Sequence, residues 1–319
     1  MIIGRAIVGA ALLALISSGV ASAADKIRAG KAIDDNWVYM PLDIGVETGI
    51  FAKYGLDVEI SNLPGGAKLQ QALLSGSIDV GLGGSQAMAL TVKGSPAIAV
   101  AAFAGPPRNF AVIVATDSPI KTVPDLKGKS MGFASNGSLP DWLMQRLSIV
   151  EGWGPNGIKG IATGGAQASN AALISHQIDS IITTRETGLS LEAKKQGRII
   201  TGLEKYAPHL ITQVIFTRQP LLQDNPDLVS RFLKAFYASV VFVKTNKEKT
   251  VEMSSRILHM DPAVISQTYD YELSMISDDG QFDPAGMQVL EDSFVELGIL
   301  TEKPTDKQVI DTRFLPVKP

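Results

Sequence analysis

Apolar residues recur along this chain in short segments, and their spacing switches repeatedly between that of a strand and that of a helix. Strands are predicted where apolar residues alternate with polar ones or run unbroken, and helices where they recur every three or four residues. The predicted strands cover residues 26–33, 56–63, 77–83, 97–103, 110–115, 130–135, 158–162, 178–183, 197–202 and 212–217. Because helical segments lie between most of these strands, the pattern predicts an α/β protein with largely parallel sheets.

The predicted helices carry recognisable start and stop signals. One is predicted over residues 41–54, and a shorter one over 67–75 is ended by Gly76. The last third of the chain is mainly helical in spacing, with a long apolar stripe from residue 228 to residue 243. A later helix begins at the pair Asp283-Pro284, which supplies an N-cap and a first-turn proline.

Two segments of the chain resemble each other. Residues 65–79, GGAKLQQALLSGSID, and residues 164–179, GGAQASNAALISHQID, both read as a glycine pair, a helix and then Ile-Asp at a strand. The second copy has one inserted residue. This similarity suggests two α/β lobes built alike, each with a glycine pair where a helix begins.

Glycine and small polar residues cluster where predicted strands end and helices begin. Four segments fit this description: Gly65-Gly66, Gly83–Gln86, Ser135–Ser138 and Gly164–Gln167. A helix N-terminus carries unpaired N–H donors, glycine lets that backbone approach a ligand, and ligands of open α/β sheets bind beyond the strands' carboxyl ends. Any one segment alone reads as an ordinary turn. Four of them, two in each half, favour a shared ligand cleft.

The first residues read as a secretory signal peptide. Arg5 precedes an apolar run from Ile7 to Ile16, and Ala21-Ser22-Ala23 offers the small residues that signal peptidase recognises. The run is too short for a membrane span, so we favour cleavage after Ala23 over an uncleaved anchor. The mature protein is therefore expected in the periplasm, and residues 1–23 are left out of the fold.

Composition narrows the function classes. The chain has 319 residues with a net charge of −3 and no long run of one sign, which argues against a nucleic-acid surface. It has no cysteine, so no disulfide is expected and no cysteine carries a lipid at the cleavage site. We expect a monomer that is free in solution.

No catalytic arrangement is recognisable. The chain has no cysteine nucleophile, and its three histidines lack the spacing of metal ligands. The motifs of zinc peptidases, α/β-hydrolases and calcium loops do not occur. Arg185 and Glu186 follow the predicted strand 178–183, where they could be a clamp and an acid or a solvated pair. We therefore predict no catalytic residue, no metal site and no cofactor.

Three segments carry a family resemblance. MPLDIGVETGIFAKYGLDVEI (40–60), NLPGGAKLQQALLSGSIDVGLGGSQAMAL (62–90) and DSPIKTVPDLKGKSMGFAS (117–135) resemble the solute-binding proteins of ABC importers in the NMT1/THI5-like group. That group includes nitrate, sulfonate, taurine and thiamine-precursor binders. The resemblance extends over nearly the whole mature chain.

The resemblance implies an α/β fold, that of a type II periplasmic binding protein. It has two lobes, each a mixed, mainly parallel sheet flanked by helices, joined by two crossing strands with the ligand between them. The crossings would lie near 110–118 and 212–218. Lobe one would comprise residues 24–115 plus 217–319, and lobe two residues 116–216. The lobes would close on a small solute and deliver it to a membrane permease.

The resemblance also implies ligand contacts after the first strand, at helix starts and after later strands. These positions are Asn36, Trp37, Gly66, Ser85, Gln86, Asn136, Ser138, Thr184 and Arg185. Trp37 could stack on the ligand or pack within its lobe. Sulfonate and taurine relatives often carry an aromatic–acid pair where this chain has Thr184-Arg185-Glu186, which speaks against a simple sulfonate assignment. An arginine there favours an anion such as a carboxylate, because the guanidinium matches planar oxygens.

Two other functions are compatible with this fold. One is an enzyme resembling those of thiamine-precursor (pyrimidine) synthesis, whose sites are histidine-rich and metal-linked and which are not exported. The sparse histidines and the predicted signal peptide favour a binding protein instead. The other is a sensor domain feeding a signalling chain, which is less favoured because these residues show no membrane segment or kinase after it.

Overall fold

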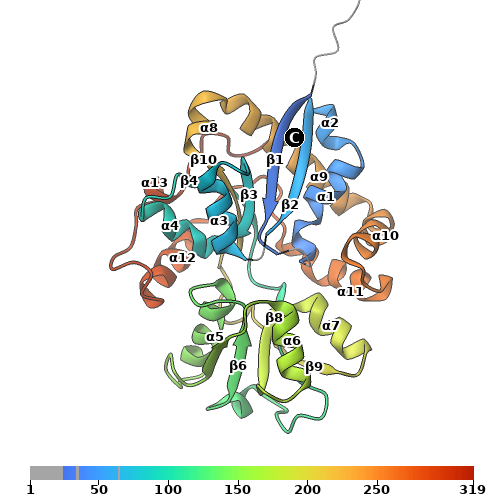
Figure 1. Cartoon of the computed structure of the whole chain (residues 1–319), viewed down its shortest axis with the longest axis vertical. Helices are drawn as coiled ribbons and strands as arrows, with labels where there is room; N and C mark the ends of the chain where they lie inside the picture. Colours follow the sequence, from blue (N-terminus) through green and yellow to red (C-terminus); the bar gives the residue numbers. More distant parts are fainter. Residues whose placement is uncertain (1–23, 34–35, 64) are drawn as a thin grey trace, which may run out of the picture.

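The computed structural model describes residues 24–33, 36–63 and 65–319. Two lobes are stacked along the long axis of the molecule, with blue, cyan and orange elements in the upper lobe and green and yellow elements in the lower one (Figure 1). The predicted signal peptide, residues 1–23, and its cleavage site lie outside the described residues. Within the described ranges, no helix combines the length and the apolar character needed to cross a bilayer.

The upper lobe, lobe one, is built on a five-stranded sheet with the order β2-β1-β3-β10-β4. β1 runs parallel to both β2 and β3, whereas β10 is antiparallel to both of its neighbours. One strand therefore runs against the others, and it is the strand that returns from the lower lobe. The bounds are β1 (Asp25–Lys31), β2 (Leu56–Asn62), β3 (Val80–Gly84), β4 (Ala97–Ala104) and β10 (Gln213–Arg218).

The lower lobe, lobe two, repeats this arrangement. Its order is β7-β6-β8-β5-β9, and β5, which arrives from lobe one, is antiparallel to both neighbours. β6 is parallel to β7 and to β8. The two sheets thus match position for position, which confirms the expected α/β fold with two lobes built alike. The bounds are β5 (Phe110–Ala115), β6 (Ser130–Phe133), β7 (Lys159–Ala162), β8 (Ser180–Thr184) and β9 (Gly197–Gly202).

Helices flank both sheets. Those of lobe one are η1 (Trp37–Tyr39), α1 (Met40–Glu47), α2 (Ile50–Lys53), α3 (Gly66–Ser75), η2 (Ser85–Met88), α4 (Ala89–Val92), α8 (Gln219–Asp224), α9 (Pro226–Thr245), α10 (Lys247–Leu258), α11 (Pro262–Glu272), η4 (Leu273–Met275), α12 (Pro284–Glu296) and α13 (Asp306–Val309). Those of lobe two are η3 (Val123–Leu126), α5 (Leu139–Val150), α6 (Ala166–Ile174) and α7 (Arg185–Ala193).

Glycines and caps set the helix ends largely as predicted. Gly76 ends α3 with a φ of 72°, and the Asp283 side chain accepts a hydrogen bond from Gly286 N at the start of α12. The helix predicted over 41–54 is instead two helices. Gly49 separates α1 from α2 with a φ of 73°, a left-handed conformation that breaks the helical path.

Sheet membership shifts the predicted lobe boundaries by one strand. Residues 110–115 were expected in lobe one, but they form β5 within the sheet of lobe two. Residues 213–216 were expected in lobe two, but they belong to β10 in lobe one. Buried backbone groups need partners, so each arriving strand pairs on both sides within a sheet. The crossings are the irregular segments 105–109 and 203–212.

The two crossing segments lie against each other. The Thr212 N–H donates to the Ala104 carbonyl at 2.8 Å. A Cβ added to Gly105 would lie 2.3 Å from the carbonyl oxygen of Leu210. This close approach requires glycine at position 105, and the two segments form the only backbone connections between the lobes within residues 65–319.

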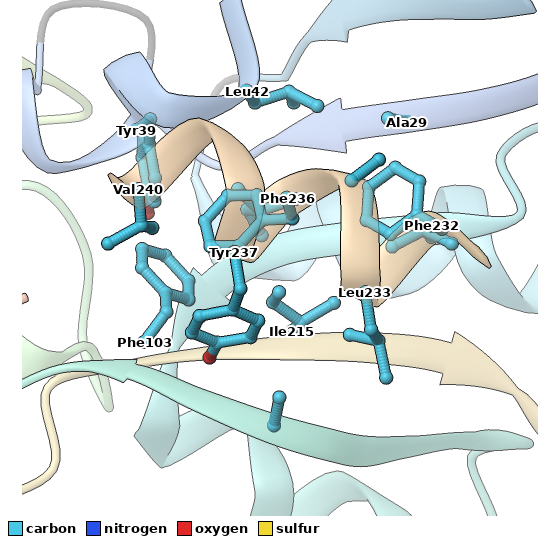
Figure 2. Close-up of a cluster of buried hydrophobic side chains, with 14 of the residues drawn as sticks. Ala29, Tyr39, Leu42, Phe103, Ile215, Phe232, Leu233, Phe236, Tyr237 and Val240 are labelled. Atoms are coloured by element: carbon cyan, nitrogen blue, oxygen red, sulfur yellow. The ribbon is translucent and has the colours of Figure 1, made fainter. Parts of the chain in front are cut away.

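The core of lobe one gathers around α9. Its side chains Phe232, Phe236 and Tyr237 are fully buried between α1 and the sheet (Figure 2). The ring of Phe236 meets that of Phe103 on β4 edge-on, with centroids 5.5 Å apart. The Tyr237 hydroxyl donates to the Ala102 carbonyl at 2.9 Å, which satisfies a buried polar group. The apolar stripe predicted for this helix therefore faces the core.

The internal sequence similarity marks an equivalent feature in each lobe. The Asp79 carboxylate, just before β3, accepts from Arg28 N on β1 at 3.0 Å. The Asp179 carboxylate, just before β8, accepts from Ser130 N on β6 at 2.8 Å. In both lobes the Ile-Asp pair therefore connects the central strand to its neighbour.

Candidate ligand-binding site

A cleft runs between the lobes at the carboxyl ends of their parallel strands. It contains two adjoining chambers of about 320 Å³ and about 310 Å³. The residues that line both chambers come from each lobe: Ala32, Ile33, Gly65, Phe110, Ala134, Ser135 and Pro140. The two chambers therefore form one interlobe space.

The four predicted glycine and small-polar segments meet at this space. Gly65-Gly66 and the pair Gly84 and Gln86 reach it from lobe one. Residues 135–138 and 164–166 reach it from lobe two. The sequence-based expectation of one shared cleft is therefore confirmed.

Four helices begin at the cleft. Their N-cap residues, Gly65 of α3, Ser138 of α5, Gly165 of α6 and Thr184 of α7, all line the chambers. The first three make no side-chain capping bond, so backbone N–H donors in the first turn of each helix are left for another acceptor. Each N-terminus also carries the positive end of its helix dipole. The cleft is thus rich in fixed donors.

The glycines near the two ends of the segment 65–84 have different roles. Gly65 takes a φ of 92°, which favours glycine, and Gly66 has open space where a Cβ would be. Gly83 lies within the sheet, where an added Cβ would be 2.6 Å from Leu69 Cδ2 of α3. Gly83 therefore serves helix–sheet packing, whereas Gly65 and Gly66 serve the cleft.

The side chains that line the cleft carry no full charge. Among the described residues that line the two chambers, none is Asp, Glu, Lys, Arg or His. Tyr39 donates its hydroxyl to Gln213 Oε1 at 2.8 Å, and burial raises the pKa of Tyr39, so its phenol stays neutral. A bound group must therefore be held by neutral side chains and backbone N–H groups.

Gln86 provides the clearest side-chain donor. Its side chain is buried, and its Oε1 lies 3.3 Å from Ser85 Oγ. Its Nε2 has no hydrogen-bond partner among the residues that the structure describes. A buried donor left unpaired is costly, so an acceptor atom of a ligand would be stabilised there.

Five of the predicted site residues line the cleft and four do not. Those that line it are Gly66, Gln86, Asn136, Ser138 and Thr184. Those that the structure places behind the lining are Asn36, Trp37, Ser85 and Arg185.

Three residues behind the lining have structural partners. The Asn36 side chain caps η1 by accepting from Val38 N at 3.3 Å, and Ser85 Oγ donates to the Ile211 carbonyl at 2.6 Å. Trp37 is fully buried, and its ring meets that of Tyr269 edge-on at 5.6 Å. Of the two readings of Trp37, packing within the lobe is the one that the geometry supports.

Arg185 lies at a contact between the lobes. Its guanidinium carbon is 3.7 Å from the centroid of the Tyr271 ring, which belongs to α11 of lobe one. The Tyr271 hydroxyl in turn donates to Glu204 of the crossing segment 203–212. Arg185 therefore faces an aromatic ring and does not line the cleft.

The surroundings of Glu186 differ most from the interpretation made from the sequence. The reading as a solvated pair with Arg185 is wrong, because Glu186 is 0 % exposed. Its Oε1 accepts the backbone N–H of Trp37 at 2.7 Å across the lobe interface. Sequence position alone could not show this, since the partner lies 149 residues away in the chain.

The sequence analysis missed several lining residues. Tyr39 and Phe110 supply aromatic surface, and Gln213 supplies an amide. Gln213 could have been predicted from the sequence, because it is a polar residue at the start of a mainly apolar strand. Phe110 could not, because an aromatic residue at the start of a buried strand is normally interpreted as part of the hydrophobic core.

Comparisons with known proteins agree with this geometry. Residues 36–250 match the family model described as NMT1/THI5 like. A Brucella abortus protein named as a candidate binding protein is 25 % identical over 72 % of this chain and 71 % of its own length.

Two solved structures share the fold. The alkanesulfonate-binding protein SsuA from Xanthomonas axonopodis pv. citri bound to MOPS superposes with a TM-score of 0.76 at 17 % identity, covering 90 % of this chain and 98 % of that one. A DszB variant in complex with biphenyl-2-sulfinic acid superposes with a TM-score of 0.64 at 14 % identity, covering 92 % and 98 %. The fold is that of the periplasmic binding proteins.

Proposed function

Because this chain belongs to the NMT1/THI5-like family, we propose that it is the solute-binding component of an ABC importer. It captures a small organic solute between its two lobes and delivers it to a membrane permease. The relatives named as binding proteins and the sulfonate-binding structure support this role.

One observation carries the proposal. The N-cap residues of four helices, one in lobe one and three in lobe two, line a single uncharged space. Such a set of donors has no role within either lobe alone, because it faces the opposite lobe. A solute that accepts hydrogen bonds from both lobes would bring them together.

The donors favour a solute with acceptor oxygens. We propose an anion, a carboxylate or a sulfonate, held by helix N-termini and by Gln86, since backbone N–H groups at a helix start bind anions without a cationic side chain. Ser138 and Thr184 add hydroxyl groups at the same helix starts. In the closed form this assignment leaves Arg185 outside the direct contacts, which revises the role expected from its sequence position.

Catalysis on the same fold is the second candidate, and the similarity to DszB is the observation that favours it. The DszB structure is of a cysteine-to-serine variant, whereas this chain has no cysteine. Its histidines are His176, His209 and His259, and none of them lines the cleft. We therefore propose binding without turnover.

The proposal includes export and free diffusion. The predicted signal peptide would deliver the protein to the periplasm, where a soluble monomer could meet the permease. The names of two structural relatives, a sulphonate-binding protein from Escherichia coli and a nitrate-binding protein from Synechocystis, describe those proteins as periplasmic.

A ligand screen tests the proposal. Thermal unfolding of the purified protein should shift upward with one class among carboxylates, sulfonates and neutral amides, because a ligand that binds only the folded state stabilises it. Small-angle scattering with the best compound should show a smaller radius of gyration. Absence of any shift across the three classes, with the protein folded, would contradict solute capture.

A further inference from the structure

Two buried glutamates lie on helices of opposite lobes that contact each other beside the cleft. Glu186 lies in the first turn of α7 in lobe two, and Glu272 is the last residue of α11 in lobe one. These helices face each other on the same side of the molecule (Figure 1). Both glutamates are 0 % exposed. The Trp37 N–H of lobe one donates to Glu186 at 2.7 Å, so Glu186 is buried by the opposite lobe.

Two carboxyl groups at such a place cannot both be ionised at neutral pH. Burial raises the pKa of Glu272 well above its usual range and the negative charge of Glu186 raises this pKa further, whereas Arg185 opposes the rise. Both carboxyl oxygens of Glu272 are buried and have no hydrogen-bond partner among the residues that the structure describes, which also favours the neutral acid. Glu186 already accepts an N–H, which favours its ionised form. The pair therefore holds one proton, with the acid on Glu272 and the carboxylate on Glu186.

We propose that this pair is a proton-linked latch, in which the lobes take up a proton when they close and release it when they open. The latch rests on the lobe closure that the proposed function requires. In the open protein both carboxyl groups would face water and ionise as ordinary glutamates. In the closed protein Glu272 keeps a proton, so a solute that closes the lobes binds more tightly at mildly acidic pH.

The other titratable groups near Glu186 and Glu272 do not account for the proposed pH dependence of lobe closure. Guanidinium groups stay charged over the relevant range. Burial raises the pKa of Tyr271, as does its hydrogen bond to Glu204, so its phenol stays neutral. Glu204 is the interlobe carboxylate that offers a matched comparison. The other charged and titratable groups on these elements contact one another: Arg108 and Arg185 lie over the Tyr271 ring, whose hydroxyl donates to Glu204, and Lys247 pairs with Asp270 and lies over the Tyr269 ring.

The direction of the pH effect follows from linkage. Because closure raises the pKa of Glu272, the closed form is most favoured below the ordinary glutamate pKa of about 4.3. It loses this advantage progressively as the pH rises toward the closed-state pKa of Glu272. Because closure takes up one proton, each rise of one pH unit lowers the ratio of closed to open protein by at most about tenfold.

Fluorescence energy transfer measures closure directly without a known ligand. The chain has no cysteine, so Lys53→Cys on lobe one and Lys194→Cys on lobe two give a unique label pair on exposed residues. In the ligand-free protein, the closed fraction should fall from about pH 5 to about pH 8. In Glu272→Gln, whose amide mimics the protonated acid, the closed fraction should no longer depend on pH.

Matched variants separate the latch from general charge effects. Glu204→Gln and the exposed Glu302→Gln should keep the pH dependence of the parent. The latch is overturned if the parent shows no pH dependence, or if Glu272→Gln keeps it. If Glu272→Gln fails to fold, infrared spectroscopy of the parent decides, because a protonated carboxyl absorption must persist at neutral pH. The ligand screen tests solute capture separately, so the latch can fail while the binding function stands.

Discussion

The backbone N–H of Trp37 in lobe one donates to the carboxylate of Glu186 in lobe two at 2.7 Å. On the other side of the cleft, Trp142 Nε1 of α5 donates to Glu296 Oε2 of α12 at 3.0 Å. The lobes are therefore joined by polar contacts on both sides of the ligand space. The helices α7 and α5 of lobe two, which take part in these contacts, lie on opposite sides of the lower lobe (Figure 1). The backbone of Trp37, a residue predicted to contact the solute, thus joins the two lobes.

Arg185 and Tyr271 should stabilise the closed form as a pair. Arg185→Ala and Tyr271→Leu are expected to show a coupling of about 1 kcal/mol in a double-mutant cycle, the magnitude of a partly buried cation–π contact. Urea unfolding of the four proteins measures it. Lys194→Ala, on the exposed face next to α7, serves as the control and should leave stability unchanged. Additive effects of the two substitutions would contradict the contact.

Gln86 should contribute directly to solute affinity. Gln86→Ala removes a buried amide donor and is expected to weaken binding by about tenfold, or roughly 1.4 kcal/mol, with little loss of stability. Isothermal titration with the compound found in the ligand screen measures this. The exposed Gln223→Ala should bind like the parent. Equal affinity in Gln86→Ala would remove Gln86 from the site.

Gly83 and Gly66 should respond differently to the same added methyl group. Gly83→Ala places a Cβ 2.6 Å from Leu69 Cδ2 and is expected to cost about 1–3 kcal/mol of unfolding free energy, because the helix must move off the sheet. Gly66→Ala meets open space and should leave the urea midpoint unchanged. A Gly83→Ala protein as stable as the parent would contradict the packing role.

Export should produce a protein that begins at Ala24. The small residues at 21–23 direct signal peptidase to that bond. N-terminal sequencing of protein recovered from a periplasmic fraction measures it. Recovery of chains that begin at Met1 would contradict cleavage.

Much of the fold could be predicted from the sequence because its signals are local. The strands at 110–115 and 197–202 match their predicted ranges, since unbroken apolar runs bounded by polar residues define them. The cap of α12 at Asp283 was equally readable. The lobe boundaries were not, because a crossing strand looks the same whichever sheet it joins, and only its pairing decides.

The cleft was predictable in outline and less so in detail. Glycine-rich helix starts identified Gly66 and Ser138, because backbone needs restrict the residue type there. Arg185 and Glu186 were misjudged in their surroundings, because their partners Tyr271 and Trp37 come from the other lobe. Such contacts depend on the relative orientation of the two lobes, which local sequence patterns do not predict.

Native mass spectrometry of the protein recovered from the periplasm tests the central claim most directly. Ala67 lines the cleft at the start of α3, so Ala67→Trp should fill that space, whereas Ala52→Trp lies on an exposed face of α2 and serves as the control. We predict one small organic molecule per chain in the parent and in Ala52→Trp, and none in Ala67→Trp. Equal occupancy in Ala67→Trp and the parent, or no bound molecule in the parent after exposure to the carboxylate and sulfonate panel, would contradict capture of a solute between the lobes.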